Sequence, residues 1–273
     1  MNLQPRARRG LLAATASAAL LLVAACGGGD GDAEGEGGAG LGLIDEGTLT
    51  ACSNVPYPPF EVEDPDAPSG YSGFDIDLLQ AMADDLDLEL AVLNVSFEAL
   101  QSGSTFVAGQ CDIGASAITI TEDREENLTF SAPYYDSLQS LLVAPGSGIE
   151  SIADLAGKKV GVQAGTTGLS YAQQNAEGAT LVEYPGNAEL WSAIQAGQID
   201  AILQDLPVNL ENAEADPSYV IVEEYSTDEQ YGYAMAKDAS PELVEAINSS
   251  LEGLREDGTY QEIYDSYFSV DPS

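Results

Sequence analysis

Two extended, apolar runs decide the architecture of this chain. They are "SLQSLLVAP", from Ser137 to Pro145, and "EQYGYAMAK", from Glu229 to Lys237. The runs stand at the two ends of a central block, residues 146–228, which would therefore be entered and left through two strands. Two strands that join one compact unit to another form a hinge, and hinges allow such units to close on each other.

Outside these runs, short apolar segments alternate with segments of helical periodicity, which predicts an α/β fold with parallel sheets. Gly258 is expected to end one late helix and Thr259 to cap the next. The predicted strands are 49–53, 88–93, 112–117, 138–144, 159–163, 180–182, 201–203 and 231–236. The predicted helices are 74–85, 97–108, 167–174, 188–196, 207–214, 241–256 and 260–267.

The charge of the chain is strongly negative. Its 273 residues include 46 Asp and Glu but only 8 Lys and Arg, and no histidine. Such a surface repels phosphate backbones and anionic lipids, which argues against nucleic-acid binding and against docking on a membrane through basic residues. The composition also favours a salt-rich solvent that screens the carboxylates.

The first 25 residues have the pattern of an export signal. Three arginines (Arg6, Arg8 and Arg9) precede the apolar run 11–23, and "LVAAC" ends at Cys26. The run is too short for a transmembrane helix, which needs about 20 apolar residues. The segment resembles a lipoprotein signal, so Cys26 would be lipidated and residues 26–43 would form a flexible tether rich in Gly and acids. The arginine pair leaves export by the general or the twin-arginine route open.

Two further cysteines, Cys52 and Cys111, remain after Cys26. In an oxidising compartment outside the cytoplasm they could form a disulfide, or they could be two buried free thiols. The spacing does not decide between these alternatives.

Six motifs follow one another in an order that resembles a known family. They are "YPPFEV", "SGFDIDLLQAMA", "GQCDIGASAITITEDREENLTFSAPYY", "ADLAGKKVGVQAGTTG", "AGQIDAILQDLP" and "DGTYQEIYDSYF". This order is similar to that of the family 3 extracytoplasmic solute-binding proteins of amino-acid ABC importers. The resemblance spans about residues 49–268, essentially the whole chain after the tether.

The resemblance implies the two-lobed, type II periplasmic-binding-protein fold with a two-strand hinge. Lobe 1 would comprise residues 44–140 and 236–273, lobe 2 residues 146–228, and the hinge strands residues 141–145 and 229–235. The ligand would be a free amino acid bound between the lobes, and the partner an ABC permease. The protein would be a monomer, held by lipid on the outer face of the cell membrane.

Arg124 is one cation among four acids in "TEDREEN". A guanidinium matches the two oxygens of a carboxylate, so Arg124 is a candidate to bind a ligand carboxylate. The spacing alone equally allows a surface ion pair with Glu125, worth less than about 1 kcal/mol. The resemblance assigns Arg124 to the carboxylate of the ligand.

The resemblance also assigns roles to other positions. Asp205 would bind the ammonium group, although it could instead cap the helix after Pro207. The helix start at Thr166 and Thr167 would offer N–H groups to the carboxylate, unless it is only an N-cap. The remaining expected contacts are Ala117 and Thr119 for the polar ends of the ligand, Tyr57 and Phe97 as aromatic walls, and Gln163; the specificity candidates are Asn54, Gln204 and Asp75.

Asn54 stands where relatives that bind cationic amino acids carry an aspartate, and three amide side chains favour a polar, uncharged ligand. An enzyme similar to cyclohexadienyl dehydratase is the alternative, because such enzymes resemble this fold. The chain offers no histidine, no nucleophile–base pair and no cluster of metal ligands, so we expect neither catalysis nor a cofactor nor a metal.

Overall fold

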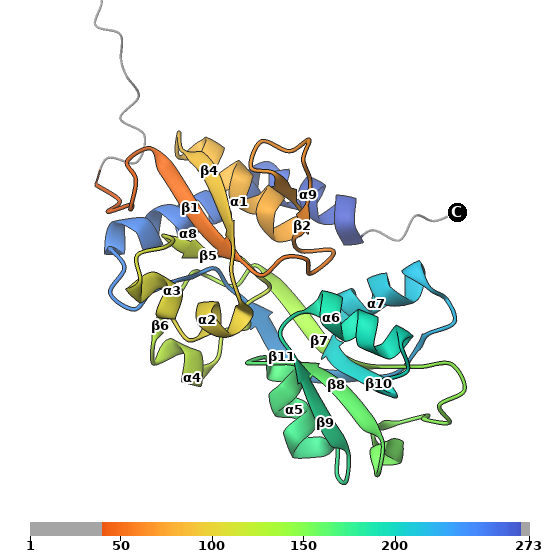
Figure 1. The fold of residues 1–273 in the computed structure, drawn as a ribbon. Helices are drawn as coiled ribbons and strands as arrows, with labels where there is room; N and C mark the ends of the chain where they lie inside the picture. Colours follow the sequence, from red (N-terminus) through yellow and green to blue (C-terminus); the bar gives the residue numbers. More distant parts are fainter. Residues whose placement is uncertain (1–39, 269–273) are drawn as a thin grey trace, which may run out of the picture. The chain divides into compact units, whose positions relative to one another are not determined.

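The computed structural model describes residues 40–268, and the expected signal, Cys26 and most of the tether lie outside the described residues. The described residues form two five-stranded sheets and one small two-stranded sheet, with helices packed against the large sheets (Figure 1). The small sheet pairs β2 (Val62–Glu63) with β3 (Tyr71–Ser72). The chain is thus an α/β protein, as its sequence pattern predicts.

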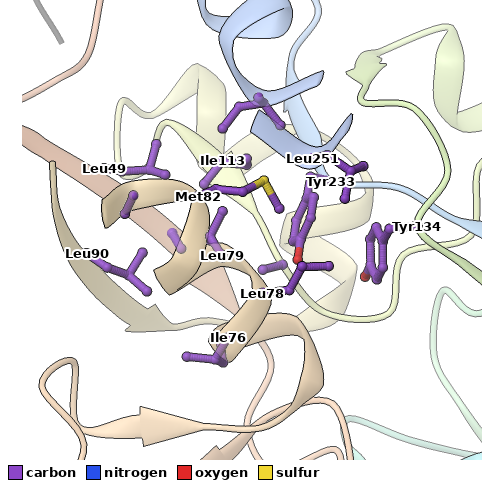
Figure 2. Close-up of a cluster of buried hydrophobic side chains, with 14 of the residues drawn as sticks. Leu49, Ile76, Leu78, Leu79, Met82, Leu90, Ile113, Tyr134, Tyr233 and Leu251 are labelled. Carbon is purple, nitrogen blue, oxygen red and sulfur yellow. The ribbon is translucent and has the colours of Figure 1, made fainter. Parts of the chain in front are cut away.

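The first sheet has the strand order β4-β1-β5-β12-β6. The strands are β1 (Thr48–Ser53), β4 (Glu89–Asn94), β5 (Ile113–Gly114), β6 (Leu128–Phe130) and β12 (Ala234–Ala236). Its main helices are α1 (Phe74–Asp85), α8 (Pro241–Asp257) and α9 (Thr259–Phe268). Leu49 of β1, Leu79 and Met82 of α1, Ile113 of β5 and Leu251 of α8 meet in one buried cluster (Figure 2).

The second sheet has the order β11-β7-β10-β8-β9. Its strands are β7 (Tyr135–Val143), β8 (Lys159–Gln163), β9 (Thr180–Tyr184), β10 (Ala201–Asp205) and β11 (Val220–Tyr231). The helices that belong to it are α5 (Thr167–Asn175), α6 (Asn187–Gln195) and α7 (Leu206–Ala215), and the short 3-10 helix Ile152–Leu155 follows β7. Two buried apolar clusters stabilise this part, one around Leu141 and Val162 and the other around Leu142 and Ile194.

Strands β7 and β11 lie side by side and run antiparallel (Figure 1). Tyr135 is the register partner of Tyr231 at one end of the pair, and Val143 is the partner of Val220 at the other. β7 contains most of the first run that flanks the central block, whereas the second run comprises the end of β11 and all of β12. Because β12 follows β11 after only two residues and belongs to the first sheet, the chain passes directly from one sheet to the other here.

Several elements differ from the sequence expectations. Both sheets are mixed rather than parallel, because β12 and β7 pair antiparallel with their neighbours. The expected helix 97–108 is two short helices, α2 (Phe97–Gln101) and α3 (Ser104–Val107), since Gly103 between them has a φ of 81°. The expected strand 231–236 is the end of β11 and all of β12, and β6 and most of β11 were not expected.

A disulfide joins Cys52 at the end of β1 to Cys111 just before β5, with the two Cα atoms 5.7 Å apart. β1 and β5 are paired neighbours in the first sheet, so this bond reinforces an existing strand contact. Of the two alternatives left open by the spacing, the structure has the bonded one.

Within residues 40–268 no helix has both the length and the apolar character needed to cross a membrane.

Candidate functional site

One pocket collects side chains from segments that follow strands of both large sheets. The pocket is narrow: only about 10 Å³ is open to the centre of a water-sized sphere, roughly the space of one water molecule. All nine residues expected to contact a ligand line it, together with Asn54 and Ser116. The lining residues are Asn54, Tyr57, Phe97, Ser116, Ala117, Thr119 and Arg124 from the side of the first sheet, and Gln163, Thr166, Thr167 and Asp205 from the side of the second.

Arg124 belongs to the short helix α4 (Glu122–Glu125), yet its side chain is buried. Its guanidinium donates to Thr119 O at 2.7 Å and to Gly165 O at 3.0 Å, and its Cζ lies 5.3 Å from the centre of the Phe97 ring. These partners are two carbonyls and a ring face rather than the neighbouring acids, so the surface ion pair with Glu125 is not formed. Two of the five N–H donors of a guanidinium are used in this way, which leaves the others for a group in the pocket.

The charge of Arg124 is maintained despite its burial. Burial lowers the pKa of Arg124 to about 10, and the negative charges of Glu229 and Asp205 oppose this shift. Arg124 is therefore cationic at neutral pH. A buried cation without a directly bonded carboxylate favours an anion in the pocket.

Asp205 ends β10 on the other side of the pocket. Its carboxylate accepts hydrogen bonds from the Tyr57 hydroxyl at 2.7 Å and from Gln139 Nε2. Although Asp205 stands at the N-cap position of α7, its side chain makes no capping hydrogen bond, so the capping alternative does not account for it. Burial, and then the charge of Glu229, raise the pKa of Asp205 to about 6. The group is thus mainly ionised at neutral pH and suits a cation.

The start of α5 borders the same space. Thr166 is the N-cap of this helix: its hydroxyl accepts from Leu169 N at 3.1 Å and donates to Gln163 O at 2.8 Å. The hydroxyl of Thr166 therefore caps the helix, as the N-cap alternative expects. The backbone N–H groups of the first turn remain a positive helix end that can bind an anion.

Asn54 and Gln163 form a chain of amides that crosses from one side of the pocket to the other. Asn54 Nδ2 donates to Val95 O at 2.8 Å, and Gln163 Nε2 donates to Asn54 Oδ1 at 2.9 Å and to Pro185 O at 3.4 Å. Because a backbone carbonyl only accepts hydrogen bonds, both ends of the chain fix the orientation of the two amides. Both N–H groups of the Gln163 amide and one of the two of the Asn54 amide are thereby used within the protein.

Ala117 occupies the pocket with a φ of 46°, an uncommon conformation for a residue other than glycine. Its N–H donates to Asp75 Oδ2 at 2.8 Å, and the Tyr134 hydroxyl donates to the same oxygen at 2.7 Å. Asp75 therefore holds the pocket loop from behind. Burial raises the pKa of Asp75 to about 7 and raises that of the neighbouring Glu61 as well.

Two specificity candidates do not line the pocket. Asp75 faces away because its carboxylate is bound to the loop backbone and to Tyr134. Gln204 faces away because successive side chains of a strand point to opposite faces, and Asp205 takes the pocket face. The side-chain amide of Gln204 donates instead to Asn187 Oδ1 at 3.2 Å and to Asn209 Oδ1 at 2.9 Å.

The sequence reasoning missed three residues at the site, namely Ser116, Gln139 and Glu229. Ser116 lines the pocket, and its hydroxyl donates to Glu61 Oε1 at 2.6 Å. Gln139 and Glu229 lie on β7 and β11 and are buried directly behind the lining residues. A signal was available for Gln139, a polar residue inside the apolar run "SLQSLLVAP", but not for Glu229, which is one of several acids in the polar strand β11.

Two α/β units joined by paired strands, with a guanidinium and a carboxylate facing one small pocket, define a binding protein of the type II periplasmic kind. Family comparison identifies it further. The chain belongs to the bacterial extracellular solute-binding proteins, family 3, whose profile matches residues 49–270.

Individual relatives share about a third of their residues with this chain. It is 32% identical to the putative ABC transporter arginine-binding protein 2 of Escherichia coli K12, over 81% of this chain and 90% of that protein. It is 34% identical to the ABC transporter glutamine-binding protein of Bacillus subtilis 168, over 74% of each chain. A solved structure of an ancestral arginine-binding protein bound to glutamine superimposes with a TM-score of 0.76 at 33% identity, covering 82% of this chain and 99% of that one.

Proposed function

We propose that this protein captures a free amino acid between two lobes and delivers it to an ABC import permease. The observation that carries the proposal is the placement of Arg124 and Asp205 around one pocket, on the sides of different sheets. A free amino acid has one carboxylate and one ammonium group, and each of these charges needs a partner once water is excluded. The pocket offers one partner of each sign.

The carboxylate of the ligand would bind the free N–H groups of Arg124 and the N–H groups at the start of α5. The ammonium group would bind Asp205. Tyr57 and Phe97 are both buried at the pocket wall and would enclose the aliphatic part of the ligand. Arg124 and Tyr57 lie on the side of the first sheet and the start of α5 on the side of the second, so the ligand would hold the two sides together.

The amide chain supports a polar side chain that can donate hydrogen bonds. The NH₂ groups of Asn54 and Gln163 are already bound to protein oxygens, whereas Gln163 Oε1 accepts no hydrogen bond from any residue in 40–268. An amide or guanidinium side chain would donate to this oxygen, but an ionised carboxylate cannot. Glutamine and similar uncharged donors therefore fit better than glutamate, and the glutamine- and arginine-binding relatives are consistent with this chemistry.

The division into lobes belongs to the same proposal. Residues 44–140 with 236–273 would form lobe 1 and residues 146–228 lobe 2, with 141–145 and 229–235 as the hinge. Residues 229–231 of β11 oppose residues 135–137 of β7, whereas residues 141–143 oppose the start of β11. The connection that would bend together with 229–235 is therefore the one at the start of β7. The protein would act as a monomer.

Members of this family are described as extracellular solute-binding proteins, so this protein acts outside the cytoplasm. We further propose that residues 1–25 are removed as a signal, that Cys26 carries the lipid, and that residues 26–43 tether the domain to the outer face of the membrane. Stable anchoring by lipid requires more than one acyl chain.

A thermal-shift screen of the mature chain, Cys26 to Ser273, tests the function. The ligands are the twenty common amino acids with ornithine and citrulline, at low and at molar salt. A ligand at 100 times its Kd should add about 2.7 kcal/mol to the free energy of unfolding and raise the Tm by several degrees. We expect a response to glutamine that exceeds the response to glutamate. A chain that responds to no amino acid, but to a prephenate-like acid, would instead favour the dehydratase-like enzyme.

A further inference from the structure

Glu229 brings together side chains from both sides of the pocket although it does not line the pocket itself. It lies near the end of β11 and is 8% exposed. Its Oε2 accepts hydrogen bonds from Thr119 Oγ1 at 2.8 Å and from Thr167 Oγ1 at 2.7 Å. Thr119 precedes α4 on the side of the first sheet, and Thr167 begins α5 on the side of the second. One carboxylate oxygen therefore links the two sides.

The remaining partners of Glu229 complete its surroundings. Its Oε1 accepts from Thr227 Oγ1 at 2.9 Å, and Gln139 Nε2 lies 3.2 Å from Oε1 and 3.3 Å from Oε2. The same Gln139 nitrogen donates to Asp205. Three hydroxyls and one amide thus converge on Glu229, which is the environment of a carboxylate that only accepts hydrogen bonds.

These bonds determine which way the hydroxyls of Thr119 and Thr167 point. A threonine hydroxyl has a single proton and two lone pairs. Since both protons are directed to Glu229, behind the pocket lining, neither remains for a ligand. The two oxygens are 3.5 Å apart and both residues line the pocket. Thr167 Oγ1 also accepts from Gln139 Nε2 at 3.4 Å, so one lone pair of Thr167 and those of Thr119 remain as acceptors for whatever binds there.

We propose that Glu229 is a positioning residue of the amino-acid site, which orients Thr119 and Thr167 so that their oxygens accept hydrogen bonds from the ammonium group of the ligand. This inference rests on the proposed function. Asp205, joined to Glu229 through Gln139, supplies the charge, and the two threonines supply further acceptors. The carboxylate of the ligand is then left to Arg124 and the backbone N–H groups of α5.

The test compares two probes that differ only in the ammonium group. They are L-glutamine and glutaramate, which keeps the carboxylate and the side-chain amide but has hydrogen in place of the amino group. In Glu229→Gln the new NH₂ group donates, so a threonine hydroxyl facing it must turn its proton toward the pocket. We expect the variant to bind L-glutamine at least about tenfold more weakly, the effect of losing a hydrogen bond to a charged group. Its affinity for glutaramate, measured by competition, should change less than threefold.

Two further variants separate positioning from general damage. Gln230→Ala changes the neighbour of Glu229 on β11, whose exposed amide donates to Asp136 and not to Glu229, and it should leave both affinities unchanged. Glu229→Asp retains the charge and should recover part of the affinity for L-glutamine. An unchanged L-glutamine affinity in Glu229→Gln, or equal losses for both probes, would overturn the inference.

The wild-type protein distinguishes this failure from failure of the proposed function. If L-glutamine does not bind to it, L-arginine and its analogue without the amino group, 5-guanidinopentanoate, replace the two probes. A wild-type protein that binds no amino acid overturns the proposed function and the role of Glu229 together. If the wild-type protein binds the amino acid but Glu229→Gln shows no selective loss of affinity for it over the analogue without the amino group, only the role of Glu229 is overturned.

Discussion

Arg124 illustrates how a single residue can lose hydration without losing its charge. Two carbonyl oxygens accept its hydrogen bonds and the Phe97 ring covers one face. Carbonyl dipoles replace part of the lost hydration, but no carboxylate of the described residues is bonded directly to the guanidinium, so its remaining N–H groups can bind the carboxylate of a ligand. This is why a carboxylate should bind here much more tightly than its contact area would suggest.

Replacing this residue tests the assignment directly. Arg124→Ala should weaken amino-acid binding by about 2–5 kcal/mol, because the buried carboxylate of the ligand loses its charged partner. Isothermal titration calorimetry measures the change. Arg255→Ala is the matched control: this arginine is exposed, stacks on Tyr260 and donates to Pro133 O, so its loss should leave affinity unchanged. Near-wild-type binding by Arg124→Ala would refute the assignment.

Asp75 makes the stability of the fold depend on pH. Its pKa is about 7 in the folded protein, against an ordinary value of 3.8, because burial disfavours the charged form. Between these values the folded state holds a proton that the unfolded chain releases. The stabilisation is therefore complete below pH 3.8 and is lost as the pH rises through about 7.

Denaturant unfolding between pH 5 and pH 8 measures this effect. The contribution of Asp75 should decrease toward pH 8, by at most about 1.4 kcal/mol per pH unit. Asp75→Asn has no proton to lose, so its stability should depend less steeply on pH than that of the wild type. Parallel pH profiles of the two proteins would show that Asp75 is already ionised throughout this range.

At the scale of elements, local signals predicted some boundaries well and others poorly. The helix Phe74–Asp85 and the strand Lys159–Gln163 agree with the sequence expectation at both ends. The expected helix 97–108 failed because Gly103 takes a left-handed conformation, which its sequence neighbours do not reveal. The polar strand β11 was missed because its partner is β7, far away along the chain, and pairing of this kind leaves little trace in local periodicity.

At the candidate site, too, some residues were predicted from local motifs and others were missed because they depend on distant contacts. Eight of the nine expected contacts stand inside the quoted motifs, Phe97 being the exception, and all nine line the pocket. Gln204 was misplaced because strand alternation places its neighbour Asp205 at the pocket. Glu229 and Gln139 were missed because their contribution comes from contacts with Thr119, Thr167 and Asp205, distant in sequence. Contacts of this kind require the fold.

The bond between Cys52 and Cys111 should stabilise the first sheet. The two cysteines are 59 residues apart in the sequence. A disulfide that closes a loop of this size lowers the conformational entropy of the unfolded chain and thereby stabilises the fold by about 2–4 kcal/mol. The double variant Cys52→Ala with Cys111→Ala should therefore unfold at a lower denaturant concentration than the oxidised wild type. Reduction of the wild type with a thiol should produce a similar loss, whereas the double variant should not respond to the thiol.

The whole molecule carries a formal net charge of −38. Repulsion among so many carboxylates opposes the compact state, and it acts over the Debye length, which falls from about 10 Å at 0.1 M salt to about 3 Å at 1 M. Stability should thus depend on salt more strongly than in a protein of balanced charge.

Thermal unfolding in 0.1 M and in 1–2 M NaCl measures this dependence. The Tm should rise with salt by several degrees, since about 1 kcal/mol corresponds to a few degrees in a chain of this size. Sucrose, which stabilises folded proteins without screening charge, is the control for general solvent effects. A Tm that does not change with NaCl, or that rises no more than in sucrose, would show that the carboxylates are already accommodated at low salt.

The register of β7 and β11 also determines how parts of this chain can be exchanged with those of relatives. Val143 and Val220 are register partners, so the segment between them leaves and rejoins the ribbon at points about 5 Å apart. A chimaera that replaces residues 144–219 with the matching segment of a relative needs only two junctions, one beside the other. It would combine Arg124 and Asn54 of this protein with foreign counterparts of Gln163, Asp205 and the start of α5, so the contribution of each side of the pocket to affinity and selectivity can be measured separately.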